Sequence, residues 1–73
     1  RSDADFIAKL GLVIEECDET AFWLELLVEA EIIGVGAIAT LLDEVDQLIR
    51  IFVASRDTAR KNAMARRARS QNR

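Results

Sequence analysis

Two closely spaced glycines, Gly34 and Gly36, interrupt a chain of 73 residues that contains no proline and only one further glycine. Without proline, long stretches of the chain can remain helical, whereas glycines allow the backbone to reverse at little steric cost. On both sides of these glycines the apolar residues recur at helical spacing. We therefore expect an all-α chain that folds as an antiparallel helical hairpin.

The sequence also indicates where each helix begins and ends. Ser2 followed by Asp5 has the pattern of a capping box, which predicts a first helix over about residues 3–30. The second helix starts either near Ala37 or at Thr40, which forms another capping-box pattern with Asp43, and we expect it over about residues 38–64. The hairpin then occupies residues 1–65, and the basic segment 66–73 is expected to be disordered.

Each predicted helix carries an apolar stripe along one side. At about 100° per residue the stripe of the first helix contains Phe6, Ile7, Leu10, Val13, Ile14, Cys17, Ala21, Leu24 and Val28. That of the second helix contains Ile38, Leu41, Leu42, Val45, Leu48, Ile49 and Phe52. The two stripes can face each other, but a two-helix layer leaves one flank open.

A second apolar patch lies on the far side of the first helix, among glutamates. One neighbouring helix cannot cover both this patch and the stripe, so we predict that the patch is an oligomer or bundle interface. Its members are Leu12, Phe22, Trp23 and Leu26.

The size of the chain also favours association. Chains this short bury only about 60% of the surface that their unfolded form exposes, and they are usually stabilised by disulfides, a metal or association. With one cysteine and no histidine, association is the remaining route, and a homo-oligomer is expected. Cys17 is consistent with a cytoplasmic protein. The uncharged run from Ile32 to Leu42 is too short to span a membrane, so no membrane association is expected.

Charge is distributed unequally along the sequence. Residues 1–47 carry twelve acidic and two basic side chains, whereas residues 48–73 carry eight basic and one acidic. Such a cationic arm binds phosphates or an anionic membrane, or only keeps the chain soluble. Beyond Val53 it has only Met64 as a large apolar residue, which disfavours the membrane. No aromatic residue follows Phe52, so any nucleic-acid contact should be weakly specific. The predicted RNA- or DNA-binding residues are Arg56, Arg60, Lys61, Arg66 and Arg67, to which Arg69 and Arg73 add charge.

Residues suited to catalysis are few. Ser55 and Thr58 have no histidine to activate them, and Lys9 is isolated among basic residues in its half of the sequence. Carboxylate metal sites in helical bundles usually add histidines, so the acidic group is interpreted as a solvated face. That group consists of Glu15, Glu16, Asp18 and Glu19. We expect neither enzymatic activity nor a cofactor or metal.

Two segments resemble a known family. "DFIAKLGLVIEECDETAFWLELL" and "LLDEVDQLIRIFVASRDTARKN" are similar to the C-terminal two helices of the four-helix bundle proteins encoded in intervening sequences of bacterial 23S ribosomal RNA genes. The accessory variability determinant of diversity-generating retroelements is similar to these proteins. The resemblance covers residues 3–62. Its most specific part is the motif formed by Glu19, Thr20, Trp23, Leu24 and Leu26.

The resemblance implies that the hairpin is half of an up-down four-helix bundle and that its subunits form a ring-like homopentamer. It further implies a nonenzymatic role, with a basic surface that engages nucleic acid and a reverse transcriptase. The alternative hypothesis is a helical protein–protein interaction module without a nucleic-acid role. Salt-sensitive binding to generic RNA distinguishes the two.

Overall fold

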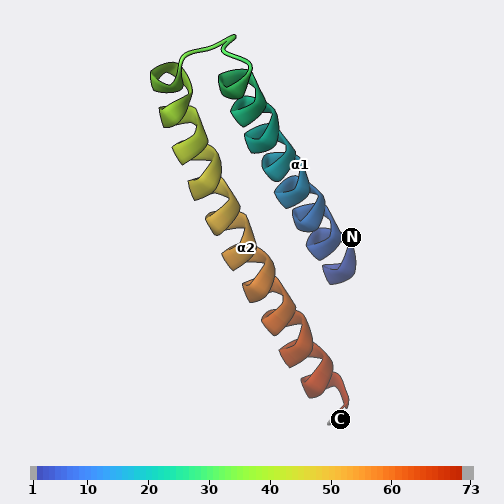
Figure 1. Ribbon diagram of the computed structural model, residues 1–73. Helices are drawn as coiled ribbons and strands as arrows, with labels where there is room; N and C mark the ends of the chain where they lie inside the picture. The colour runs from blue at the N-terminus through green and yellow to red at the C-terminus, as the bar shows by residue number, and fades with distance from the viewer. Residues whose placement is uncertain (1, 72–73) are drawn as a thin grey trace.

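The computed structural model describes residues 2–71 and contains two helices, α1 (Asp3–Glu29) and α2 (Val35–Gln71). They run antiparallel and are joined by one short turn (Figure 1). No strand occurs within the described residues. The prediction of an all-α helical hairpin is confirmed.

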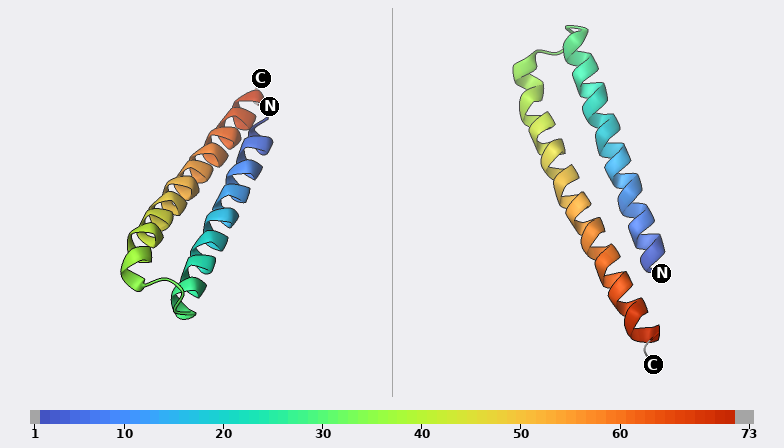
Figure 2. Two further views of the ribbon diagram at one scale, coloured as in Figure 1. Left: turned by 90° about the horizontal axis from the view of Figure 1, so that it is seen from above. Right: turned by 60° about the horizontal axis from the view of Figure 1, so that its bottom comes forward.

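The hairpin is a rod rather than a globule. Its principal extents are 61 × 16 × 15 Å and its radius of gyration is 17.4 Å, whereas a compact domain of this length has a value of about 11 Å. The accessible surface is 5784 Å², against about 4,500 Å² for a compact monomer of the same mass. Both views in Figure 2 show that no other element covers the helix pair. The chain therefore exposes about 1,200 Å² more surface than a compact domain would.

The helices meet along a narrow seam whose residues alternate at spacings of three and four. In α1 this seam comprises Ile7, Leu10, Ile14, Cys17, Ala21, Leu24 and Val28. In α2 it comprises Ile38, Leu42, Val45, Ile49, Phe52, Arg56, Ala59 and Ala63. This is the spacing at which two antiparallel helices pack as a coiled coil. Only Leu10, Ile14 and Ile38 are buried, and the other seam residues are half-buried.

The start of α1 agrees with the sequence pattern. Ser2 has extended backbone angles, and its hydroxyl accepts a hydrogen bond from the backbone N–H of Asp5 at 3.1 Å. This bond satisfies one of the donors left free at a helix start, and the acidic residues of the first turn favour the positive end of the helix dipole. The predicted cap at Ser2 is confirmed.

The reversal of the chain does not depend on the glycines, contrary to expectation. Glu31 adopts the left-handed conformation with φ 59°, and no glycine among the described residues has a positive φ. The N–H groups of Glu31 and Ile32 donate to the carbonyls of Val28 and Leu27 at 3.0 and 3.1 Å, the pattern of a Schellman helix end.

The start of α2 is also earlier than predicted. The helix begins at Val35, and the carbonyl of Gly34 accepts the N–H of Ala37 at 3.1 Å. Thr40 consequently lies in the second turn of the helix and caps nothing, so the alternative start at Thr40 is wrong, whereas the start near Ala37 differs from the observed one by two residues. The chain has already reversed at Glu31, and no proline follows, so the helix can begin as early as Val35.

The basic segment 66–73, expected to be disordered, is helical as far as the structure describes it. α2 continues to Gln71 and projects past the first turn of α1, whereas Asn72 and Arg73 lie outside the described residues (Figure 1). The segment is rich in arginine, which has high helix propensity, and cations near a helix C-terminus favour the helix dipole. Arg66 also contacts Asp3, so the last turns are tied to α1.

Over residues 2–71, neither helix combines the length and the apolar character needed to cross a bilayer.

Candidate functional site

Large apolar side chains are exposed along one side of the hairpin, which we call the apolar flank. It consists of Phe6, Leu12 and Val13 from α1, of Leu41 and Leu48 from α2, and of the interspersed Thr20 and Ser55. A shallow groove along it is lined by Leu12, Val13, Glu16, Cys17 and Thr20 from α1 and by Val45 and Leu48 from α2. Toward the chain termini a second stretch of groove is lined by Phe6, Ala54, Ser55, Thr58, Ala59 and Asn62.

The two hydroxyl groups on the apolar flank are already occupied. The Thr20 hydroxyl donates to the carbonyl of Glu16, and the Ser55 hydroxyl donates to that of Ile51, each at 2.9 Å. Each hydroxyl already donates within its own helix. Covering it with another apolar surface would therefore not leave a buried O–H group without a hydrogen-bond partner. The flank therefore behaves as an apolar surface along both helices.

The prediction from the sequence assigned several flank residues to the wrong face of their helix. Phe6, Val13, Leu41 and Leu48 were predicted to lie on the stripe that faces the other helix, but all four are exposed. Positions 6, 13 and 20 in α1, and 41, 48 and 55 in α2, are each seven residues apart. This seven-residue spacing beside the seam is the signal that marks them as a separate face.

The predicted interface residues do not form one patch. Leu12 lines the groove of the apolar flank, and Leu26 is half-buried. Phe22 and Trp23 are 54% and 58% exposed, and their rings meet edge to face with centroids 5.6 Å apart. They form a second exposed apolar surface, the aromatic pair, on the outer side of α1.

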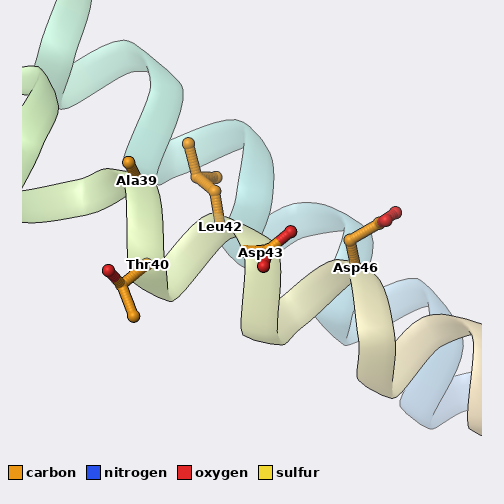
Figure 3. A pocket seen from close by; sticks show the side chains of 5 residues that line it. All are labelled: Ala39, Thr40, Leu42, Asp43 and Asp46. Atoms are coloured by element: carbon orange, nitrogen blue, oxygen red, sulfur yellow. The ribbon is translucent and has the colours of Figure 1, made fainter.

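The opposite side of the hairpin is acidic. Near the turn it presents Glu25 and Glu29 from α1, together with Asp43 and Asp46 from α2. Figure 3 shows a hollow there whose lining comes from α2 alone, with Thr40 directed away from Leu42 and with the two aspartates spread along the helix. These groups diverge instead of converging on a common point, so the hollow does not form a binding site. No cluster of three or more potential metal ligands occurs within residues 2–71.

Folding the chain back on itself divides the rod into two halves of opposite charge. The half nearer the turn, residues 16–49, carries nine carboxylates and no basic side chain, for a net charge of -9. The half nearer the termini, residues 3–15 and 50–71, carries eight basic and four acidic side chains, for a net charge of +4. We call these the acidic half and the basic half.

The five predicted nucleic-acid-binding residues fall into three environments. Arg56 occupies a seam position, half-buried, and its Nε is buried without a hydrogen-bond partner among the described residues. Arg66 is engaged by Asp3: its Nε donates to Oδ2 at 3.2 Å and its Nη2 to Oδ1 at 2.5 Å. Arg60, Lys61 and Arg67 are exposed. These last three side chains can contact a phosphate, whereas Arg56 lies in the seam between the helices and Arg66 is paired with Asp3.

Comparisons with protein-family models, curated proteins and solved structures find no match for this chain.

Proposed function

We propose that the chain is a nonenzymatic assembly module of the four-helix-bundle type, as its resemblance to the intervening-sequence proteins implies. The observation that carries this proposal is the apolar flank, which runs along both helices and is covered by nothing in the hairpin. Exposed apolar strips of this kind mark interaction surfaces. A further pair of helices laid on this flank would complete a four-helix bundle.

The amount of surplus surface supports association. Standard interfaces bury about 800 Å² on each partner. The hairpin exposes about 1,200 Å² more than a compact monomer of its mass, so one such interface would account for most of the excess. With only three buried side chains among residues 2–71, the isolated hairpin has little core of its own, and burial of the flank would contribute much of the stability.

Nucleic-acid binding is part of the proposal. Arg60, Lys61 and Arg67 are exposed near the end of α2, and assembly would bring several copies of this weakly attractive surface together. The homopentameric ring and the reverse transcriptase partner remain proposals that rest on the family resemblance alone.

A helical protein–protein interaction module without a nucleic-acid role is the second candidate. The aromatic pair of Phe22 and Trp23 favours it, because aromatic residues are over-represented at the energetic centres of protein interfaces. The pair borders the apolar flank on the outer side of α1, and in this second candidate it contacts a different protein.

Sedimentation velocity at micromolar concentration tests the assembly proposal. The wild type should sediment as an oligomer, and Leu48→Glu should weaken association by at least tenfold, because it places a charge on the apolar flank. Met64→Glu is the matched control: Met64 is 66% exposed and lies about 160° around α2 from Leu48, so this variant should assemble normally. A folded wild-type monomer at 100 micromolar would overturn the proposal.

A further inference from the structure

We infer that the apolar flank is covered by a second copy of this chain packed with its ends reversed, so that the turn of each copy lies over the basic half of the other. The inference rests on the self-association proposed above and specifies its partner and orientation, with a two-fold pair in place of the five-membered ring that the family resemblance implies. The result is a two-fold symmetric four-helix bundle in which α1 packs against α1 and α2 against α2, each pair antiparallel.

Charge decides between the two ways in which such copies can pair. If the two turns lay at the same end, an acidic half of charge -9 would face another of -9. With the ends reversed, each -9 half faces a half of +4. Both arrangements bury the same flank and keep neighbouring helices antiparallel, so the apolar contact does not choose between them. Repulsion between like halves opposes the first arrangement and attraction favours the second.

The flank sets the level about which the copies reverse. Val13 and Leu48 line the same stretch of groove and lie midway along the flank. Reversing a second copy about this level brings Phe6 of each copy to the level of Thr20 of the other, so the two flanks overlap along their length.

Spin-label distances measured on the full chain test the orientation. Ile32 lies in the turn and is 70% exposed, so a label at Ile32→Cys, in a chain carrying Cys17→Ala, should leave the fold intact. From a helix rise of about 1.5 Å per residue, the two turn labels of a reversed pair should be about 50–60 Å apart. A pair with its turns together should give about 10–20 Å, since packed helices lie about 8–10 Å apart.

A second label pair supplies the complementary measurement. Ala68 is exposed near the end of α2, and mixing chains labelled at Ala68→Cys with chains labelled at Ile32→Cys should give a short distance only if the ends are reversed. Circular dichroism and sedimentation of the Cys17→Ala chain check that the cysteine-free background folds and associates. A short turn-to-turn distance would overturn the inference and leave the assembly proposal standing.

Salt dependence provides an independent test. Association of reversed ends should weaken several-fold between about 50 and 500 mM salt, because screening removes an attraction, whereas association of like ends should strengthen. A sedimenting species of five chains would also overturn the reversed pair while supporting assembly. A folded monomer would overturn both proposals.

Discussion

Arg66 holds Asp3 through two hydrogen bonds, and this contact joins the last turns of α2 to the first turn of α1 across 63 positions of sequence. It is a paired guanidinium–carboxylate contact, the geometry in which such pairs are strongest. It closes the end of the hairpin opposite the turn. The segment that carries Arg66 was expected to be disordered, and this contact is one reason that it is helical.

The contact makes a prediction about titration. The hydrogen bond from Arg66 lowers the pKa of Asp3 below its ordinary value of 3.8, against a smaller opposing effect of desolvation. Since the folded-state pKa is the lower one, the pair stabilises the fold fully above pH 3.8 and loses this contribution as pH falls through the folded-state pKa. An NMR titration of the Asp3 carboxyl should show the lowered pKa, and Arg66→Gln should raise it toward the ordinary value.

Amide hydrogen exchange tests the structural role of the same pair. Asp3→Asn should speed exchange in the last two turns of α2, because the guanidinium loses its charged partner. Asp5→Asn is the matched control, since it removes the same charge from the same turn without touching Arg66. Equal exchange in the two variants would contradict a role for the pair in holding the end of α2.

The turn yields a second prediction. Glu31 has a left-handed backbone, which costs a residue with a side chain about 1–2 kcal/mol, whereas glycine adopts it freely. Glu31→Gly should therefore raise the free energy of unfolding by about 1 kcal/mol in urea titrations. Glu31→Ala removes the same charge but keeps the steric cost, so it should show little gain. A similar gain in both variants would indicate that charge, and not backbone conformation, is responsible.

Arg56 provides a third prediction. A buried donor without an acceptor costs about 1–3 kcal/mol. Arg56→Met keeps much of the apolar stem and removes the unpaired Nε, so it should raise the free energy of unfolding of the hairpin by about 1 kcal/mol. Arg60→Met, at an exposed position on the same helix, should change it by less than about 0.5 kcal/mol.

Much of the fold follows from local sequence patterns. Which of the apolar positions beside the seam are covered by the other helix does not. Ser2 and Asp5 predicted the cap because the cap is made within four residues of chain. Helical spacing placed Phe6 and Leu48 on the same side as the true seam residues. Whether a position beside the seam is covered depends on how many helices pack against it, and a single partner covers only a narrow strip.

The turn and the end of α2 could not be predicted for related reasons. Glycine is the usual residue in a left-handed position, so Gly34 and Gly36 were the natural candidates, yet the hydrogen bonds that end α1 place Glu31 there. The charge of the last residues indicated disorder, whereas helix propensity and a contact with Asp3, distant in sequence, keep them helical. The same contact removes Arg66 from the set of free cations, which sequence spacing alone cannot reveal.

The aromatic pair leads to a fourth prediction. Trp23 is three residues after Thr20 and therefore borders the apolar flank on α1. Its emission should shift to shorter wavelength as the protein concentration rises through the association range, because groups of another copy would shield the indole. Trp23→Ala should lower the stability of the hairpin itself by no more than about 1.5 kcal/mol, chiefly through the lost edge-to-face contact with Phe22. Emission independent of concentration would place Trp23 outside the assembly interface.

The basic half of the rod leads to the last prediction, on nucleic-acid binding. We expect low-specificity binding to RNA or DNA that weakens steeply between about 50 and 200 mM salt, as the release of counterions from several phosphates requires. Replacing both Arg60 and Arg67 with Gln should weaken binding to all sequences alike and reduce the salt slope by about 1–2 for duplex DNA. Both residues are exposed and lie outside the seam and the apolar flank, so assembly should be unchanged.

The matched control removes two other positive charges of the basic half, through Lys9→Gln on α1 and Arg50→Gln on α2. Arg50 is already paired with Asp46 at 2.7 Å, and Lys9 lies on the acidic helix, so neither is expected to contact a phosphate. The control should keep the wild-type salt slope, because the slope counts the phosphates contacted and not the net charge of the protein. Equal losses in both double variants would show that net charge alone governs the attraction. If the wild type does not bind at low salt, the protein–protein interaction module becomes the better account of this chain.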